Sequence, residues 1–232
     1  MTLLDYLALF LFAFLWFAFA WITGQGRIFS RTSLTQAMAE RRRQWIVNSL
    51  GRDLKMIDTQ ILSGLQNGTA FFASTSILAI GGCFALLGQT DQVDSVLKDL
   101  PFVVESGRST FELKVFVLTA IFGYSFFKFG WSYRLFNYCT ILFGTLPMAE
   151  EARRDPQGAA RAAELTIRMN IIAAGHFNSG LRALFMSIGY LGWFASPYVF
   201  MATSLTVFVV LLRRQFFSEA RLALIETTPP SP

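Results

Sequence analysis

Four long apolar stretches divide the chain, and polar, mostly basic segments separate them. The stretches run over residues 3–23, 70–89, 113–132 and 184–212. A helix needs about 20 predominantly apolar residues to cross the hydrocarbon core of a bilayer, so each stretch is long enough for a transmembrane helix. The pattern therefore predicts an all-α, polytopic membrane protein with four transmembrane helices, organised as one helical membrane domain over residues 1–232.

The fourth stretch is longer than one crossing requires. It carries Gly189, Gly192 and Pro197 in its first half. A tilt, a kink at the proline or a turn back within the membrane would each accommodate the excess length. We expect one kinked span, and a turn back is the alternative that the sequence leaves open.

Two polar segments have the periodicity of amphipathic helices. The first covers residues 33–66, and the second covers residues 155–180 and opens with Asp155-Pro156, a typical helix start. We expect both to form a cytoplasmic helical layer, followed by a C-terminal tail over residues 213–232. The third span is predicted to extend as one helix from Phe111 to Leu146, and the part beyond the bilayer needs a cover, either from this layer or from a neighbouring subunit.

The positions of Lys and Arg predict the orientation. Seven basic residues lie between Arg27 and Lys55, whereas only Lys98 and Arg108 lie between residues 90 and 112. Cytoplasmic loops are enriched in Lys and Arg, so the amino terminus is predicted outside. One conflict remains, because a single fourth span would place Arg213, Arg214 and Arg221 outside as well.

Composition agrees with a membrane protein and excludes several other classes. Hydrophobic residues make up 53% of the chain and charged residues only 15%, which is too little charge for the surface of a soluble domain. The net charge of +5 is explained by topology, so we expect no nucleic-acid partner. One histidine and two cysteines do not make a metal site, and no phosphate-binding, dinucleotide or hydrolase motif occurs. We therefore expect no metal, no cofactor and no enzymatic activity, and we expect Cys83 and Cys139 to be inert packing residues.

Five polar residues near the predicted inner membrane surface are candidates for binding an anion or lipid headgroup, or for lining a pathway. They are Lys128, Arg134, His176, Asn178 and Arg182. Arginine offers a bidentate donor fork to phosphate, and ionisable residues inside a span are costly unless they have a role. The competing interpretation is structural: Lys128 and Arg134 snorkel to the interface, and residues 176–182 form a helix corner.

Three segments carry a resemblance to a known family. They read DTQILSGLQNGTAFFASTSILAIGG from Asp58, ELKVFVLTAIFGYSFFKFGWSYRLFNYCTILFGTL from Glu112, and FNSGLRALF followed by GWFASPYVF after His176. Their order and spacing resemble DUF599, a family of uncharacterised membrane proteins found in bacteria and plants. The resemblance implies a four-span helical membrane protein and supplies no activity, cofactor or catalytic residue. We expect the protein in the bacterial inner membrane.

Two functions of different classes follow from these observations. The first is a homo-oligomeric channel or transport-type protein, because small residues on the second span and a broken fourth span are devices of transport proteins. The second is a non-transporting accessory protein whose cytoplasmic helices bind a partner or the anionic leaflet. The expected partners are the lipid bilayer, a second copy of the chain and, for the accessory function, another membrane protein.

Overall fold

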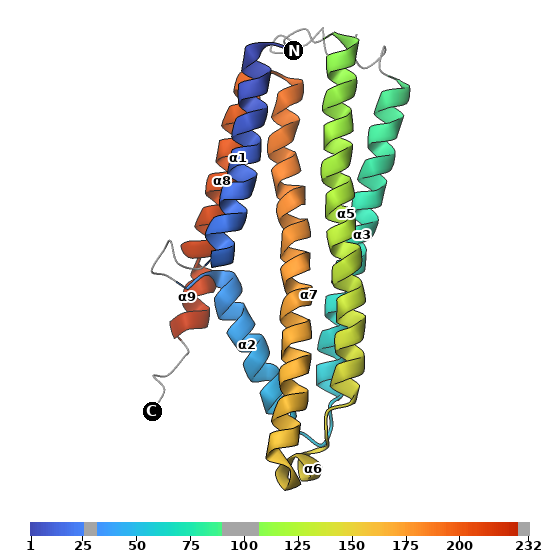
Figure 1. Ribbon diagram of the computed structural model, residues 1–232, viewed down its shortest axis with the longest axis vertical. Helices are drawn as coiled ribbons and strands as arrows, with labels where there is room; N and C mark the ends of the chain where they lie inside the picture. Colours follow the sequence, from blue (N-terminus) through green and yellow to red (C-terminus); the bar gives the residue numbers. More distant parts are fainter. Residues whose placement is uncertain (26–31, 90–106, 227–232) are drawn as a thin grey trace. The chain divides into compact units, whose positions relative to one another are not determined.

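The computed structural model describes residues 1–25, 32–89 and 107–226, which form helices and no strand. The helices are α1 (Leu3–Gln25), α2 (Leu34–Ser49), α3 (Met56–Gly88), α5 (Arg108–Gly144), α6 (Ala149–Arg154), α7 (Pro156–Leu191), α8 (Pro197–Phe216) and α9 (Glu219–Glu226), shown in Figure 1. Arg27, Arg31 and Lys98, which entered the orientation prediction, lie outside the described residues. The all-α class is thus confirmed.

Four helical segments are long and apolar enough to cross a membrane. They are Leu3–Thr23, Met56–Gly88, Arg108–Gly144 and Pro197–Ile225. The number agrees with the sequence prediction, but the boundaries differ for three of them. The predicted span over residues 70–89 continues without a break from the last part of the predicted amphipathic segment 33–66, because α3 begins at Met56; the first part of that segment forms α2.

The predicted fourth span over residues 184–212 is two helices. Helix α7 ends at Leu191, a 3-10 turn covers Gly192–Phe194, and α8 begins at Pro197 with the Ser196 hydroxyl capping its first turn. Thr203 donates a hydrogen bond to the carbonyl of Gly189 at 2.6 Å, although fourteen residues of one continuous helix would separate them by about 21 Å. The chain therefore turns back, and the expectation of one kinked span was wrong.

Glycine makes this close return possible. A Cβ atom on Gly189 would lie 3.1 Å from Cα of Ser204, and one on Gly192 would lie 3.0 Å from the carbonyl oxygen of Val199. The backbones of α7 and α8 approach each other directly at these two positions. Helices pack in this way in membranes, where small residues at the interface allow extensive van der Waals contact.

The chain divides into two compact units, although the sequence suggests one domain. Unit 1 consists of Met1–Leu34, Ser76–Tyr124 and Leu181–Pro232, and unit 2 consists of Thr35–Thr75 and Ser125–Gly180. Helices α3, α5 and α7 contribute residues to both units.

The core of unit 1 is built from aromatic side chains. Phe12, Tyr190, Trp193 and Phe200 are buried, and the centroids of contacting rings within this group lie 5.3–5.6 Å apart. They come from α1, the end of α7, the 3-10 turn and α8, so the aromatic cluster joins the α7–α8 hairpin to α1. Helix α1 lies beside α8 along its length (Figure 1).

The core of unit 2 is smaller and mainly aliphatic. Ile46 of α2, Leu62 of α3, Phe143 of α5 and Ile167 of α7 are buried together, and Trp45 stacks on Phe143 with ring centroids 6.0 Å apart. The extension of α5 beyond residue 132 is therefore covered by helices of the same chain. Asp155 starts α7 as predicted, since its carboxylate accepts a hydrogen bond from the Gly158 amide at 2.9 Å.

Candidate lipid-contacting and anion-binding residues

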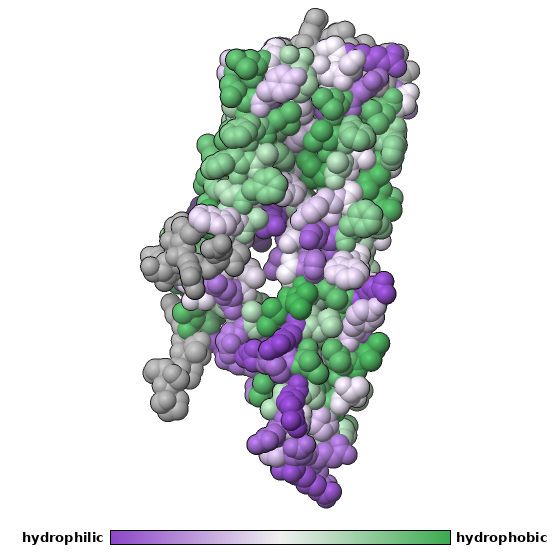
Figure 2. All heavy atoms as spheres, in the orientation of Figure 1, coloured by the Kyte–Doolittle hydropathy of each residue, from purple (hydrophilic) through white to green (hydrophobic). Residues whose placement is uncertain are grey.

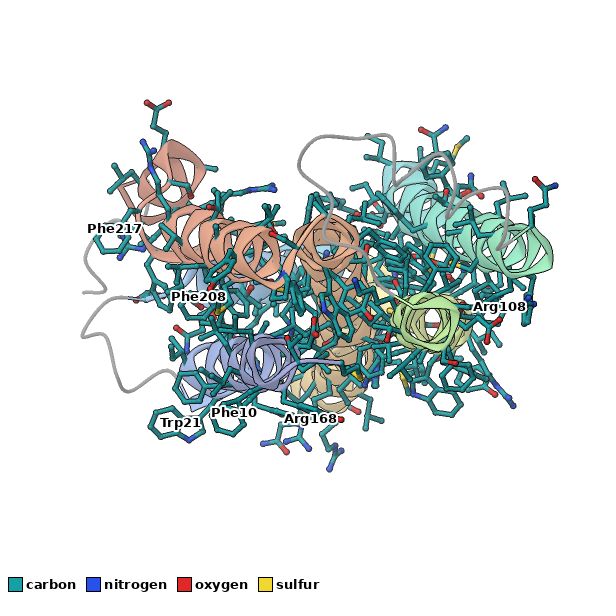
Figure 3. The ribbon with its side chains drawn as sticks, turned by 90° about the horizontal axis from the view of Figure 1, so that it is seen from above. Phe10, Trp21, Arg108, Arg168, Phe208 and Phe217 are labelled. Carbon is teal, nitrogen blue, oxygen red and sulfur yellow. The ribbon has the colours of Figure 1, made fainter. Side chains whose placement is uncertain are left out.

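The exposed face of α1 has the pattern of a lipid-facing helix. Five aromatic residues follow one another at spacings of three and four and are 57–72% exposed: Tyr6, Phe10, Phe14, Phe17 and Trp21. Figure 3 shows Phe10 and Trp21 pointing away from the neighbouring helices, and Figure 2 shows hydrophobic residues over the visible face of this part of unit 1. Tyr and Trp at the two ends, about 22 Å apart along the helix, match the aromatic belts at the two surfaces of a bilayer.

Three of the predicted site residues come together on one face of unit 2. The guanidinium of Arg134 lies 5.8 Å from the ring centroid of Trp131 and 5.5 Å from that of Tyr138, and its Nε donates to the Tyr138 hydroxyl at 2.6 Å. His176 of α7 also contacts Trp131, with ring centroids 6.5 Å apart. Lys128 precedes Trp131 by three residues on α5 and so lies on the same face of that helix. We call this set the basic–aromatic face: Lys128, Trp131, Arg134, Tyr138 and His176.

The basic–aromatic face combines the two residue types that membrane surfaces attract. Trp and Tyr prefer the headgroup level, and Lys and Arg are attracted to anionic lipids by about 1 kcal/mol each. Arg134 has no carboxylate within 4.0 Å among the residues described, so its partners are the two aromatic rings and the tyrosine hydroxyl. Phosphate groups of lipids are therefore suitable ligands for its remaining donors.

The other two predicted residues lie elsewhere. Asn178 is exposed on α7, and the neighbouring Phe177 points into an aromatic group with Phe72 and Phe129. Arg182 belongs to unit 1, where its guanidinium lies 5.6 Å from the centroid of Phe19. The five predicted residues thus do not form one site: three share a face of unit 2, and Arg182 has its own surroundings.

The chain was compared with known families, curated proteins and solved structures. Residues 7–220 match the family described as "Protein of unknown function, DUF599". The chain belongs to DUF599. Neither a curated protein nor a solved structure matches it. The DUF599 match runs from α1 into α9, so it covers most of both units and the whole α7–α8 hairpin.

Sequence reasoning missed a buried carboxylate in unit 2. Asp58 has no exposed surface, and its Oδ1 accepts hydrogen bonds from Trp45 Nε1 at 2.7 Å and from Arg52 at 2.5 Å. Close by, the Lys55 ammonium donates to the carbonyl oxygens of Leu146 and Pro147, and burial lowers the pKa of Lys55. These contacts tie the start of α3 to α2 and to the end of α5. The spacing of these residues along the chain does not indicate that they interact, because Asp58 and Lys55 meet their partners only after the helices pack.

A second missed cluster lies in the core of unit 2. Arg42 donates to the side-chain oxygen of Asn170 at 2.6 Å, and the Asn170 amide lies 3.5 Å from the sulfur of Cys139. Cys139 itself is buried and points to the carbonyl of Thr166 at 3.7 Å. The expected packing role of Cys139 therefore includes polar contacts. Burial lowers the pKa of Arg42, which nevertheless stays charged at any physiological pH.

Proposed function

We propose that this DUF599 protein is a non-transporting accessory protein of the bacterial inner membrane, with its amino terminus outside. Unit 2 lies on the cytoplasmic side and binds the anionic leaflet through the basic–aromatic face. The observation that carries the proposal is the contact of Arg134 and His176 with Trp131, with Lys128 one helical turn before Trp131 on α5. Such a group of basic and aromatic residues suits lipid headgroups.

The α7–α8 hairpin supports this orientation. Because α8 returns along α7, the end of α8 lies beside the residues of α7 that enter unit 1: the Arg214 guanidinium is 5.5 Å from the ring centroid of Phe185. Arg182, Arg213 and Arg214 therefore share one end of unit 1. With this end inside, the conflict with the positive-inside rule disappears, since the C-terminal arginines join the other basic segments.

The filled interior of unit 1 supports a function other than transport. Trp193, Tyr190 and Phe200 have no exposed surface and pack against one another. A polar pathway needs water-accessible groups along its length, and this buried aromatic cluster supplies none where α1, α7 and α8 pack together.

A homo-oligomeric channel is the second candidate, and α3 is the observation in its favour. Of the four candidate spans, α3 is the least buried within the chain. Small residues are exposed along it at Gly64, Thr75 and Gly82, which suits close packing against another helix. A second copy covering α3 would form a pathway only between subunits.

Orientation is tested by cysteine labelling in right-side-out membrane vesicles. The two native cysteines are buried, so Ser109→Cys and Glu219→Cys each provide one accessible thiol in a background in which Cys83 and Cys139 are replaced by alanine. We expect an impermeant maleimide to label position 109 from outside and position 219 only after permeabilisation. Labelling of both positions from the same side would contradict the hairpin topology.

The lipid function is tested on the purified full-length protein in detergent. We expect phosphatidylglycerol to raise the thermal unfolding midpoint more than phosphatidylcholine does, and this difference to fall at least by half in the double variant Lys128→Gln, Arg134→Gln. The matched control, Arg153→Gln with Arg161→Gln, removes two exposed charges elsewhere in unit 2 and should leave the difference unchanged. An equal loss of this difference in both variants would mean that lipid stabilisation depends only on net charge.

The channel is tested by ion flux. Flux of potassium or chloride through reconstituted vesicles above that of empty vesicles would favour the channel.

A further inference from the structure

Arg182 is held in a fixed position by three helices of unit 1. It lies on α7, its guanidinium stacks over the ring of Phe19 on α1, and its side chain donates a hydrogen bond to Tyr124 on α5. Tyr124 in turn meets Trp16 edge to face, with ring centroids 5.7 Å apart. The arginine is therefore preorganised, and little conformational entropy is lost when a ligand binds to it.

The positive charge of Arg182 has no anionic partner in the part of the chain that the structure describes. No described carboxylate lies within salt-bridge distance of it, and its Nε is buried without a hydrogen-bond acceptor. By contrast, Arg43 of unit 2 forms a bidentate pair with Glu164. A guanidinium removed from water without a partner is strongly unfavourable, because its five donors and its charge both lose solvation. Arg182 thus lacks an acceptor that carries negative charge.

A second arginine packs on the turn of α7 that follows Arg182. Arg214 of α8 stacks over Phe185, which follows Arg182 by three residues on α7 and so shares its face. Arg213 and Arg214 are both exposed on α8, but among the described residues only Arg214 stacks on Phe185. The hairpin therefore places Arg214 beside Phe185, one helical turn after Arg182 on α7.

The depth of Arg182 in the membrane follows from α1. Phe19 precedes Trp21 by two residues, which is about 3 Å along the helix. Trp21 ends the lipid-facing aromatic stripe and projects outward in Figure 3, as expected for a residue at the headgroup level. Because Arg182 stacks on Phe19, it lies at nearly the same level of unit 1 as Trp21, which is the level expected for lipid headgroups.

We infer that Arg182 and Arg214 form a stoichiometric site in unit 1 for the phosphate group of one anionic phospholipid. Arginine binds phosphate through two parallel N–H donors, and Phe19 and Tyr124 orient Arg182 for this contact. The inference goes beyond the leaflet binding proposed for unit 2 and does not depend on it. The basic–aromatic face is exposed, so its affinity for lipid headgroups should fall with ionic strength. The site at Arg182 takes one lipid and is partly desolvated, so its affinity should depend less on ionic strength.

The test is native mass spectrometry of the purified full-length protein in detergent. The added ligands are phosphatidylglycerol, phosphatidylcholine and inorganic phosphate. We expect one phosphatidylglycerol to be retained per chain, with no displacement by phosphatidylcholine or inorganic phosphate at equal concentration. Arg182→Gln should weaken retention about tenfold or more, and Arg182→Lys less, since lysine keeps the charge but loses the bidentate fork.

Further variants separate a binding role from a structural one. Tyr124→Phe keeps the ring that meets Trp16 and removes only the hydroxyl that orients Arg182, so retention should weaken several-fold while the unfolding midpoint without lipid stays within a few degrees of the native value. Arg213→Gln is the charge-matched control and should retain the lipid as the native chain does. The double variant Lys128→Gln, Arg134→Gln should also retain it.

Three results would overturn the inference. The first is equal retention in Arg182→Gln and in the native chain. The second is displacement of phosphatidylglycerol by inorganic phosphate, which would assign the site to the free anion. The third is an equal loss of lipid retention in Arg213→Gln and in Arg182→Gln, which would show that retention depends only on the net charge. In the first case, loss of the lipid in the unit 2 double variant would in addition assign the retained lipid to the leaflet binding proposed for unit 2.

Discussion

Unit 1 buries large aromatic rings, whereas unit 2 buries mostly aliphatic side chains and carries most of the described ion pairs. Four of the five ion pairs among the described residues lie in unit 2: Arg43–Glu164, Arg52–Asp58, Arg154–Glu150 and Arg168–Glu164. In unit 1 the described ion pair, Arg108–Glu112, lies within the first turn of α5. The end of unit 2 that carries α6 is correspondingly hydrophilic (Figure 2).

This difference reflects the surroundings that each unit is suited to. Lipid tails are as apolar as leucine, so burial of apolar area does not drive helices together in a membrane, and close van der Waals packing must do so. Interlocking rings and glycine contacts, as in unit 1, supply such packing. In water, an apolar core with charged residues outside is stable, and unit 2 has that pattern.

The largest expected effect is the loss of the Trp193 side chain. Trp193→Ala removes a fully buried ring from the aromatic core and the donor that bonds Asp5 at 2.8 Å. We expect the free energy of unfolding in detergent to fall by about 3–5 kcal/mol. The matched control is Trp131→Ala, because Trp131 is about half exposed on unit 2, and its loss should cost about 1 kcal/mol or less. Equal effects would contradict the assignment of the aromatic cluster as the core of unit 1.

The next effect tests the polar contacts of unit 2. Asp58→Ala leaves the Trp45 indole donor without its acceptor and removes the partner of Arg52. We expect a loss of about 1–3 kcal/mol in the free energy of unfolding, because a buried donor is left unsatisfied. Glu150→Ala, which breaks an exposed pair with Arg154, should cost no more than about 1 kcal/mol. A smaller effect of Asp58→Ala than of Glu150→Ala would show that burial does not strengthen this contact.

The helical hairpin is tested by filling the contact at Gly189. Gly189→Val places methyl groups against the backbone of Ser204, and we expect a loss of about 1–2 kcal/mol from overpacking. Gly123 on α5 has open space around its Cβ position, so Gly123→Val should change the free energy of unfolding by about 0.5 kcal/mol or less. The comparison is made by thermal unfolding in the same detergent. Equal midpoints would exclude a close approach of α7 and α8.

The sequence predicted the helical class and the long α5 because apolar run length and helix start signals are local properties. It also predicted that Asp155 starts a helix, and the structure confirms this. It did not predict the turn at Gly192, because an apolar stretch with glycine and proline is compatible with a kink as well as with a reversal. Only the contact of Thr203 with Gly189, fourteen residues away, distinguishes the two.

The candidate residues could be predicted from the sequence, but their arrangement could not, because the arrangement depends on tertiary packing. Lys128, Arg134 and His176 were recognised as polar residues at the end of apolar stretches, but the contact of His176 with Trp131 depends on how α5 packs on α7. Asp58 and Arg42 were not recognised, since a charged residue in a polar segment has no unusual sequence context. Burial distinguishes them, and burial depends on tertiary packing.

The smallest expected effect concerns pH and the surface of unit 2. Hydrogen bonds from Arg43 and then Arg168 lower the pKa of Glu164 below its ordinary value of 4.5. A carboxylate with a lowered pKa in the folded state stabilises that state above its unfolded pKa, and this contribution is lost as the pH falls through the folded value. Glu164→Gln should therefore lower the thermal unfolding midpoint slightly at pH 7, and the difference from the native chain should shrink once the pH drops below about 4.5 and then disappear. High salt should reduce the difference at pH 7, because both partners are partly exposed and their charges are screened. A difference that grew on acidification would mean that the protonated form of Glu164 stabilises the fold. The ion pairs of Glu164 would then not stabilise unit 2, and they would not distinguish it from unit 1.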